Sequence, residues 1–138
     1  MKKMILVLGI LVISLGMIVA SVSPVHAQST IMNGGSIRFA PGASSQVITG
    51  RADGNIAVRY EFYAAAGQSA TITLNSDTNQ AILSVRTLSG QQLMGFESRS
   101  AAFGMPLPVS GGYEILVYNP NPTATNYSFL LSIPPRAN

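Results

Sequence analysis

Apolar and polar residues alternate along several stretches of the chain with the period of two that is typical of β-strands. The first long stretch spans residues 56–63, in which Ile56, Val58, Tyr60 and Phe62 alternate with polar or small residues. The alternation recurs in four later stretches, residues 69–74, 83–86, 113–118 and 127–133. Because successive side chains of a strand point to opposite faces, each stretch predicts a strand with one buried and one outer face.

The apolar faces of these strands define an expected hydrophobic core. Its members are Tyr60, Phe62, Ile72, Leu83, Val85, Tyr113, Ile115, Val117, Phe129 and Leu131. A slip of one residue in register would turn all of these side chains outward, so the list tests the assignment of faces.

Turn-forming residues separate the strands, as at Asp53-Gly54-Asn55, Ser89-Gly90 and Gly111-Gly112. No segment has the length and periodicity of a crossover helix, which favours antiparallel pairing. We therefore predict an all-β, single-domain antiparallel β-sandwich of jelly-roll type. The sandwich is expected over residues 36–134, with a tail at 135–138.

Two segments lack the strand pattern. Residues 28–35 are expected to form a flexible lead-in to the sandwich. Residues 95–108 are expected to form a long loop, since Pro106 and Pro108 would restrict this segment to an edge or a loop. This loop carries Phe96, Arg99 and Phe103.

Residues 1–27 have the pattern of a helical secretory signal peptide. Lys2 and Lys3 precede a 17-residue apolar run, and Val25-His26-Ala27 forms a cleavage site, so we expect cleavage after Ala27. An uncleaved anchor is the alternative, because the run approaches the length of a membrane-spanning helix. The expected location is the periplasm or the extracellular medium.

Removal of this leader changes the charge of the chain. Both lysines and the single histidine lie within residues 1–27, so the remaining part carries six Arg against five Asp and Glu. A net charge of +1 gives no electrostatic support for binding nucleic acid or an anionic membrane. The chain has no Cys, so neither a disulfide nor a lipid-modified cysteine is available.

The residue types of the exported part exclude most catalytic sites. Without His, Cys or Lys, it can form no Ser-His-Asp or Cys-His site, no Schiff base and no histidine or cysteine zinc site. A carboxylate-based hydrolase, using Glu97 or Asp77, is the remaining enzyme class and is disfavoured because no pattern pairs two acids. Glu61 and Glu114 are expected to be solvated surface charges. No cofactor is expected.

Calcium is the one metal that the sequence allows. The segment Asn75-Ser76-Asp77-Thr78-Asn79 offers several oxygen ligands. The same residue types also build turns without metal, and the acidic residues of an EF-hand loop are missing. A weak calcium site in this turn stays open.

Binding is the function that remains. Aromatic and Arg side chains are enriched at protein contacts, and the expected partner-binding residues are of these types or lie in the predicted turns. They are Tyr63, Arg86, Phe96, Arg99, Phe103, Ser110 and Tyr118. Cross-strand pairing is the alternative role of the strand residues, and capping of one end of the sandwich is that of the 95–108 loop.

Three parts of the chain carry a family resemblance. They are residues 59–68 with the following strand 70–74, the strand 83–85 with its Ser89-Gly90 turn, and residues 109–117 with 126–129. Together they resemble the bacterial pre-peptidase C-terminal domain, and they are similar also to the periplasmic inhibitors of g-type lysozyme. The resemblance implies a β-sandwich and, for the inhibitors, a protein that plugs an enzyme cleft with its loops. Val58 stands where the broader family usually has Asp, so no role of that Asp is carried over.

These observations predict a secreted or periplasmic, non-catalytic binding module of the pre-peptidase C-terminal type. Its expected partner is an envelope or extracellular protein, or a polysaccharide. A periplasmic inhibitor of g-type lysozyme is the alternative function.

Overall fold

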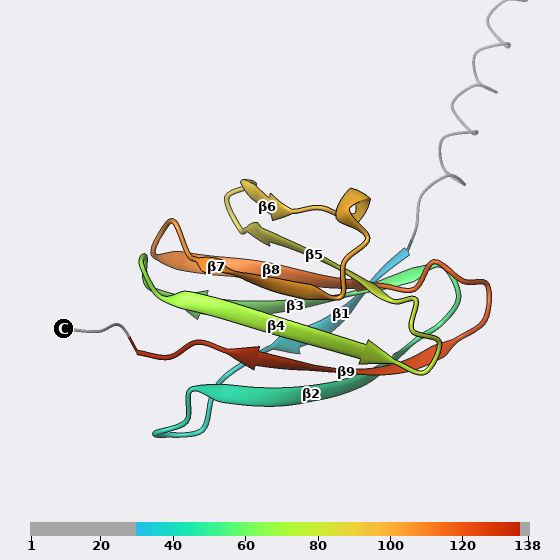
Figure 1. The fold of residues 1–138 in the computed structure, drawn as a ribbon, viewed down its shortest axis with the longest axis horizontal. Helices are drawn as coiled ribbons and strands as arrows, with labels where there is room; N and C mark the ends of the chain where they lie inside the picture. The colour runs from blue at the N-terminus through green and yellow to red at the C-terminus, as the bar shows by residue number, and fades with distance from the viewer. Residues whose placement is uncertain (1–29, 136–138) are drawn as a thin grey trace, which may run out of the picture.

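The computed structural model describes residues 30–135, which form nine strands and one short 3-10 helix (Figure 1). The elements are β1 (Thr30–Ser36), β2 (Ser45–Ala52), β3 (Ile56–Ala64), β4 (Ser69–Ser76), β5 (Ile82–Thr87), β6 (Gln92–Met94), η2 (Phe96–Ser98), β7 (Ala102–Pro106), β8 (Gly111–Tyr118) and β9 (Thr125–Ser132).

The strands form two sheets that face each other (Figure 1). One sheet has the order β1-β3-β8-β5-β6 and the other the order β2-β9-β4-β7. Apart from β1, these orders are those of a jelly roll, in which successive strands other than the β5–β6 pair lie in opposite four-stranded sheets. The predicted all-β sandwich of jelly-roll type is confirmed.

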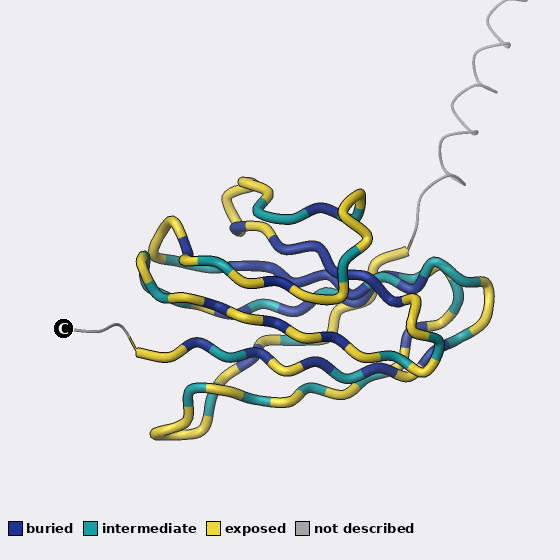
Figure 2. The backbone as a smooth tube through the Cα atoms, viewed as in Figure 1, coloured by how far each residue is buried: buried dark blue, intermediate teal, exposed yellow. Residues whose placement is uncertain are grey.

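The core lies between the sheets, where the buried positions of neighbouring strands face each other (Figure 2). All ten residues of the expected core are buried there, so the assignment of inner and outer faces is confirmed. Phe62 stacks on Tyr113 with ring centroids 5.3 Å apart, and Tyr60 meets Phe129 edge-on at 5.1 Å. Aromatic pairs of this kind add to the stabilisation from buried area.

Two tyrosines bridge the sheets through their hydroxyl groups. The hydroxyl oxygens of Tyr60 on β3 and Tyr127 on β9 are 2.5 Å apart, and both residues are buried. Burial, together with the hydrogen bond to Tyr60, raises the pKa of Tyr127 far above its usual range. Glycine is required beside these rings, because a Cβ at Gly34 or Gly50 would lie 2.5 Å from the nearest tyrosine atom.

The expectation of a flexible lead-in at residues 28–35 was wrong for residues 30–35, which belong to β1. This strand pairs with β3 in a parallel register, from Thr30 opposite Ile56 to Ser36 opposite Glu61. The chain reaches the parallel position without a helix, because β2 makes the crossover in the opposite sheet. A bulge at Asn33 to Gly35 interrupts the alternation, which is why the pattern did not reveal the strand.

Of the two placements that the prolines allow for residues 95–108, an edge or a loop, the edge is correct for residues 102–106, and the expectation of a loop there was wrong. The segment contains η2 and β7, and β7 is an edge strand paired only with β4. Pro106 ends β7, which fits the restriction of proline to edges. Phe103 faces the core opposite Ile72, and Gly104 gives the strand little side-chain pattern of its own.

The predicted leader, residues 1–27, lies outside the described residues. Over residues 30–135, no helix has the length and apolar character needed to cross a membrane.

Candidate functional site

The outer face of the five-stranded sheet brings together four of the seven predicted binding residues. Tyr63 on β3, Arg86 on β5 and Tyr118 on β8 alternate with core residues of their strands and so share this face. Phe96 of η2 lies over the same face, with its ring centroid 5.2 Å from that of Tyr118. Segments that are far apart in the sequence thus contribute to one surface.

A cluster of four charged side chains lies in the middle of this face, and we call it the arginine cluster: Arg59, Glu61, Arg86 and Glu114. Glu61, Glu114 and Arg86 are direct cross-strand neighbours on β3, β8 and β5. Arg59 donates hydrogen bonds to both glutamates, through Nη2 to Glu61 at 2.5 Å and through Nε to Glu114. Arg86 donates through Nε to the other oxygen of Glu114.

Glu114 is buried, although it points to the outer face of the sheet. Its side chain is 5% exposed, whereas those of Arg59 and Arg86 are 28% and 47% exposed. Burial alone would raise the pKa of Glu114, but the hydrogen bonds and charges of Arg86 and Arg59 outweigh it and hold that pKa below its usual range. The expectation of a solvated charge was wrong for Glu114, because flanking arginines on both neighbouring strands cover it.

Two apolar side chains continue the same face beside the arginine cluster, and we call them the Tyr63–Leu88 ridge. Tyr63 is 68% exposed and Leu88 is 42% exposed. The side chains of both residues pack over Gly112, because a Cβ added there would lie 2.3 Å from Leu88 Cδ1 and 3.0 Å from Tyr63 Cε2. Leu88 was not predicted as a binding residue. It lies two residues after Arg86, and the alternation of side chains along a strand therefore places it on the same outer face.

A groove of about 430 Å³ runs beside the cluster and the ridge. Arg59, Arg86 and Glu114 line one part of it, and residues 87–90 of the turn between β5 and β6 line the rest. Tyr and Arg, which are exposed side by side on this face, are among the residue types enriched in protein-binding hot spots.

The other three predicted residues lie elsewhere. Arg99 follows η2 in a left-handed backbone conformation, with φ of 49°, and borders a separate hollow beside residues 120–121. Ser110 precedes β8, where its Oγ accepts a hydrogen bond of 2.8 Å from the Ala66 amide. Phe103 is in the core, so its assignment to a binding surface was wrong.

The acids of the described residues do not form a hydrolytic pair. Glu61 and Glu114 are cross-strand neighbours, which the sequence pattern did not show. Both carboxylates accept hydrogen bonds from the guanidinium group of Arg59. A glycosidase-type acid needs a raised pKa, whereas the pKa of Glu114 is lowered. Asp77, just after β4, accepts a hydrogen bond from Asn126 on the neighbouring strand β9, and Glu97 accepts one from Gln92 at 3.4 Å.

The described residues contain no group of three or more His, Cys, Asp or Glu that could hold a metal ion. In the turn after β4, the polar side chains bond within the protein. Ser76 Oγ accepts from the Ala81 amide at 3.3 Å, and Thr78 bonds Thr125 at 3.3 Å. These contacts assign a turn-building role to the segment that was considered for calcium.

Comparison with family models and with curated proteins found no match. Solved structures do match. The PliG protein of Aeromonas hydrophila, described as a periplasmic lysozyme inhibitor of g-type lysozyme, has a TM-score of 0.64 at 24% identity and covers 78% of this chain and 100% of its own. PliG of Salmonella Typhimurium gives 0.57 at 19% identity, covering 78% and 100%.

A pre-peptidase C-terminal domain of a Bacillus anthracis collagenase also matches, with a TM-score of 0.43 at 14% identity over 78% of this chain and 97% of that domain. The two PliG proteins superpose over their whole length, so the likeness extends to a complete domain. What this chain shares with the PliG lysozyme inhibitors is their β-sandwich fold.

Proposed function

We propose that this chain is an exported, non-catalytic binding domain that docks a protein partner on the outer face of its five-stranded sheet. The observation that carries the proposal is the arrangement of the arginine cluster and the Tyr63–Leu88 ridge side by side on one open face. Tyr and Arg dominate the energetics of protein interfaces when they are held rigidly. Glu114 supplies that rigidity here, because it fixes Arg59 and Arg86 through their Nε atoms.

We further propose a g-type lysozyme as the partner and the periplasm as the place of action. Support comes from the shared fold with PliG proteins, which are described as periplasmic inhibitors of that enzyme. An exported leader, expected at residues 1–27, is consistent with this location. An inhibitor of this kind needs only to bind its enzyme. This agrees with the carboxylates of the arginine cluster, which are hydrogen-bonded to arginines.

The test measures binding of the protein, residues 28–138, to a g-type lysozyme, together with inhibition of cell-wall hydrolysis. A lysozyme of another class serves as the control enzyme. Saturable binding and inhibition at micromolar concentration are expected for the g-type enzyme alone. Absence of binding would reject lysozyme as the partner.

A matched pair of variants tests the docking face. Leu88→Ala and Leu130→Ala remove equally exposed leucines, at 42% and 41%, from the outer faces of opposite sheets. Binding should weaken about tenfold or more for Leu88→Ala, as for a hot-spot side chain, and should be unchanged for Leu130→Ala. Equal effects of the two variants would contradict docking on this face.

A further inference from the structure

A hollow opens at the edge of the sandwich where the chain passes from one sheet to the other. After β1 ends, the Ile37 amide bonds the Glu61 carbonyl at 2.8 Å, and the chain then leaves to begin β2 in the opposite sheet. Ile133, just after β9, is held there by a hydrogen bond of 2.8 Å from its amide to the Ser44 carbonyl. The segment between β1 and β2 therefore joins the two sheets at this edge.

We call this space the edge hollow, and its volume is about 350 Å³. Buried Ile37, Phe62 and Ile133 contribute to its lining, together with half-buried Phe39 and exposed Tyr63. A second hollow of about 390 Å³ shares Phe39, Tyr63 and Ile133 and so extends the same space. These volumes lie in the range of small-molecule sites, about 300–1,000 Å³, and the lining combines apolar and aromatic side chains with a few polar ones, Ser36, Ser44 and Gln68.

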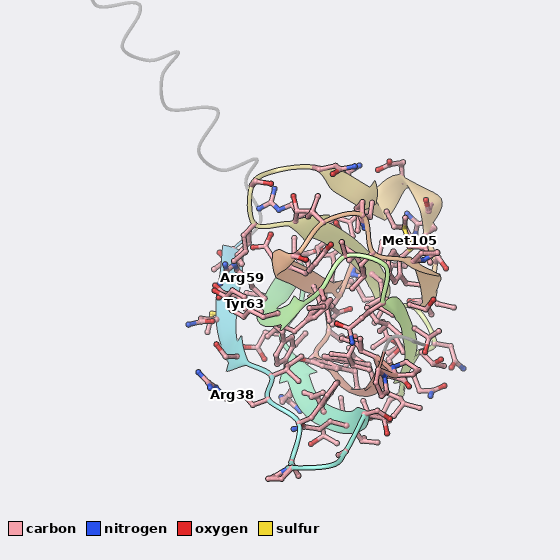
Figure 3. The ribbon with its side chains drawn as sticks, turned by 90° about the vertical axis from the view of Figure 1, so that its left-hand side faces the viewer. Arg38, Arg59, Tyr63 and Met105 are labelled. Atoms are coloured by element: carbon pink, nitrogen blue, oxygen red, sulfur yellow. The ribbon has the colours of Figure 1, made fainter. Side chains whose placement is uncertain are left out.

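One cation stands at the edge hollow without a partner. Arg38 is exposed, and in the described part of the chain it forms no ion pair and no hydrogen bond through its side chain or its backbone amide. Arg51, Arg59 and Arg86 are each paired with an acid. In Figure 3, Arg38 projects from the same side of the molecule as Tyr63 and Arg59, clear of other labelled side chains.

We propose that the edge hollow binds a medium-chain acyl carboxylate, with the acyl chain against Phe39 and Ile133 and the carboxylate at Arg38. The negative charge complements Arg38, the one arginine that lines this hollow in the described residues, and the apolar lining complements the chain. A peptide would require several hydrogen bonds from the lining, whereas an acyl chain requires none. Tyr63 borders both this hollow and the docking face, but the proposed contacts are made by Arg38, Phe39 and Ile133, which are not part of the docking face, so this site does not depend on the proposed function.

The experiment follows backbone amide NMR signals of the protein, residues 28–138, during titration with decanoate below its micelle concentration. Saturable shifts are expected at Phe39, Tyr63 and Ile133. Decyltrimethylammonium, which carries the same chain and the opposite charge, should cause much weaker shifts. A short peptide with a C-terminal leucine tests the other source of an apolar carboxylate and should not bind.

Two arginine variants make the test specific. Arg38→Gln should weaken decanoate binding about five- to tenfold, because one charge-assisted contact is lost. Arg99→Gln, which removes the other exposed arginine without an ion pair in the described residues, should leave binding unchanged. Both side chains are exposed, so neither change should unfold the domain.

Several results would overturn the proposal. These are absence of saturable shifts with decanoate, equal binding by Arg38→Gln and the unaltered protein, equal binding of the cationic compound, or binding of the peptide in place of decanoate. Lysozyme binding is a separate readout, so failure of the edge hollow leaves the docking face untouched, and the reverse holds as well.

Discussion

Replacement of Glu114 by Gln tests the arginine cluster, because it removes one charge and almost no volume. The carboxylate holds Arg59 and Arg86 with separate oxygens, whereas an amide has one acceptor and turns a donor toward the other guanidinium. The contact with partly buried Arg59 is worth about 1.5–2.5 kcal/mol, and that with half-exposed Arg86 about 0.5 kcal/mol. We expect Glu114→Gln to cost about 2–3 kcal/mol of unfolding free energy at neutral pH.

Urea unfolding followed by circular dichroism measures this loss, with Glu61→Gln as the matched control. Glu61 is 25% exposed and pairs only with Arg59, so its replacement should cost under about 1 kcal/mol. The folded-state pKa of Glu114 is lowered, so its stabilising contribution is present above the unfolded-state pKa of about 4.3 and is lost as the pH falls through the folded-state value.

The difference between Glu114→Gln and the unaltered protein should therefore shrink toward zero as the pH falls through the folded-state pKa of Glu114. A difference that does not shrink as the pH is lowered would refute the assignment to charge, since protonated Glu114 and Gln are both neutral. Equal losses for Glu114→Gln and Glu61→Gln would refute the role of burial.

Three further changes test the core and its polar contacts. Phe62→Ala should lower the unfolding free energy by about 3–5 kcal/mol, whereas Val47→Ala at an exposed position should change it by less than about 0.5 kcal/mol. Near-equal losses in urea unfolding would mean that the inner and outer faces of the strands are assigned the wrong way round. Asn119→Ala should cost about 2–4 kcal/mol, because the fully buried amide donates to three backbone carbonyls, and a lower melting temperature checks it. Unfolding free energy should fall as the pH rises above about 10, since the unfolded chain loses tyrosine protons that buried Tyr127 keeps. Tyr127→Phe removes the titrating group and should lessen this fall in a pH series of urea titrations; an equal fall in both proteins would contradict the assignment to Tyr127.

The sequence pattern predicted the strands that carry long regular alternation and failed where side chains are small. Tyr60, Phe62 and Tyr113 identified their inner faces because large apolar residues recur at every second position. β1 was missed because Gly34 and Gly35 interrupt its pattern at a bulge. The sequence of β1 also carries no sign of its pairing with β3, because the chain between these two strands passes through the opposite sheet as β2.

The candidate site was predicted in part for the same reason. Tyr63, Arg86 and Tyr118 followed from alternation within their own strands. The burial of Glu114 did not, because it depends on which strands flank β8, and this is a property of topology. The register that places Glu61 and Arg86 beside Glu114 is set by pairings more than 25 residues away in sequence.

The position of β9 has a consequence for the order in which the sandwich can form during synthesis. This strand is the last of the nine described strands to be synthesised, yet it lies between β2 and β4 and pairs with both. Until it emerges, β2 has no partner in its sheet, so the sandwich cannot close on the strands before it. The topology thus delays completion of the fold until β9 is available, and the earlier strands remain open to other partners until then.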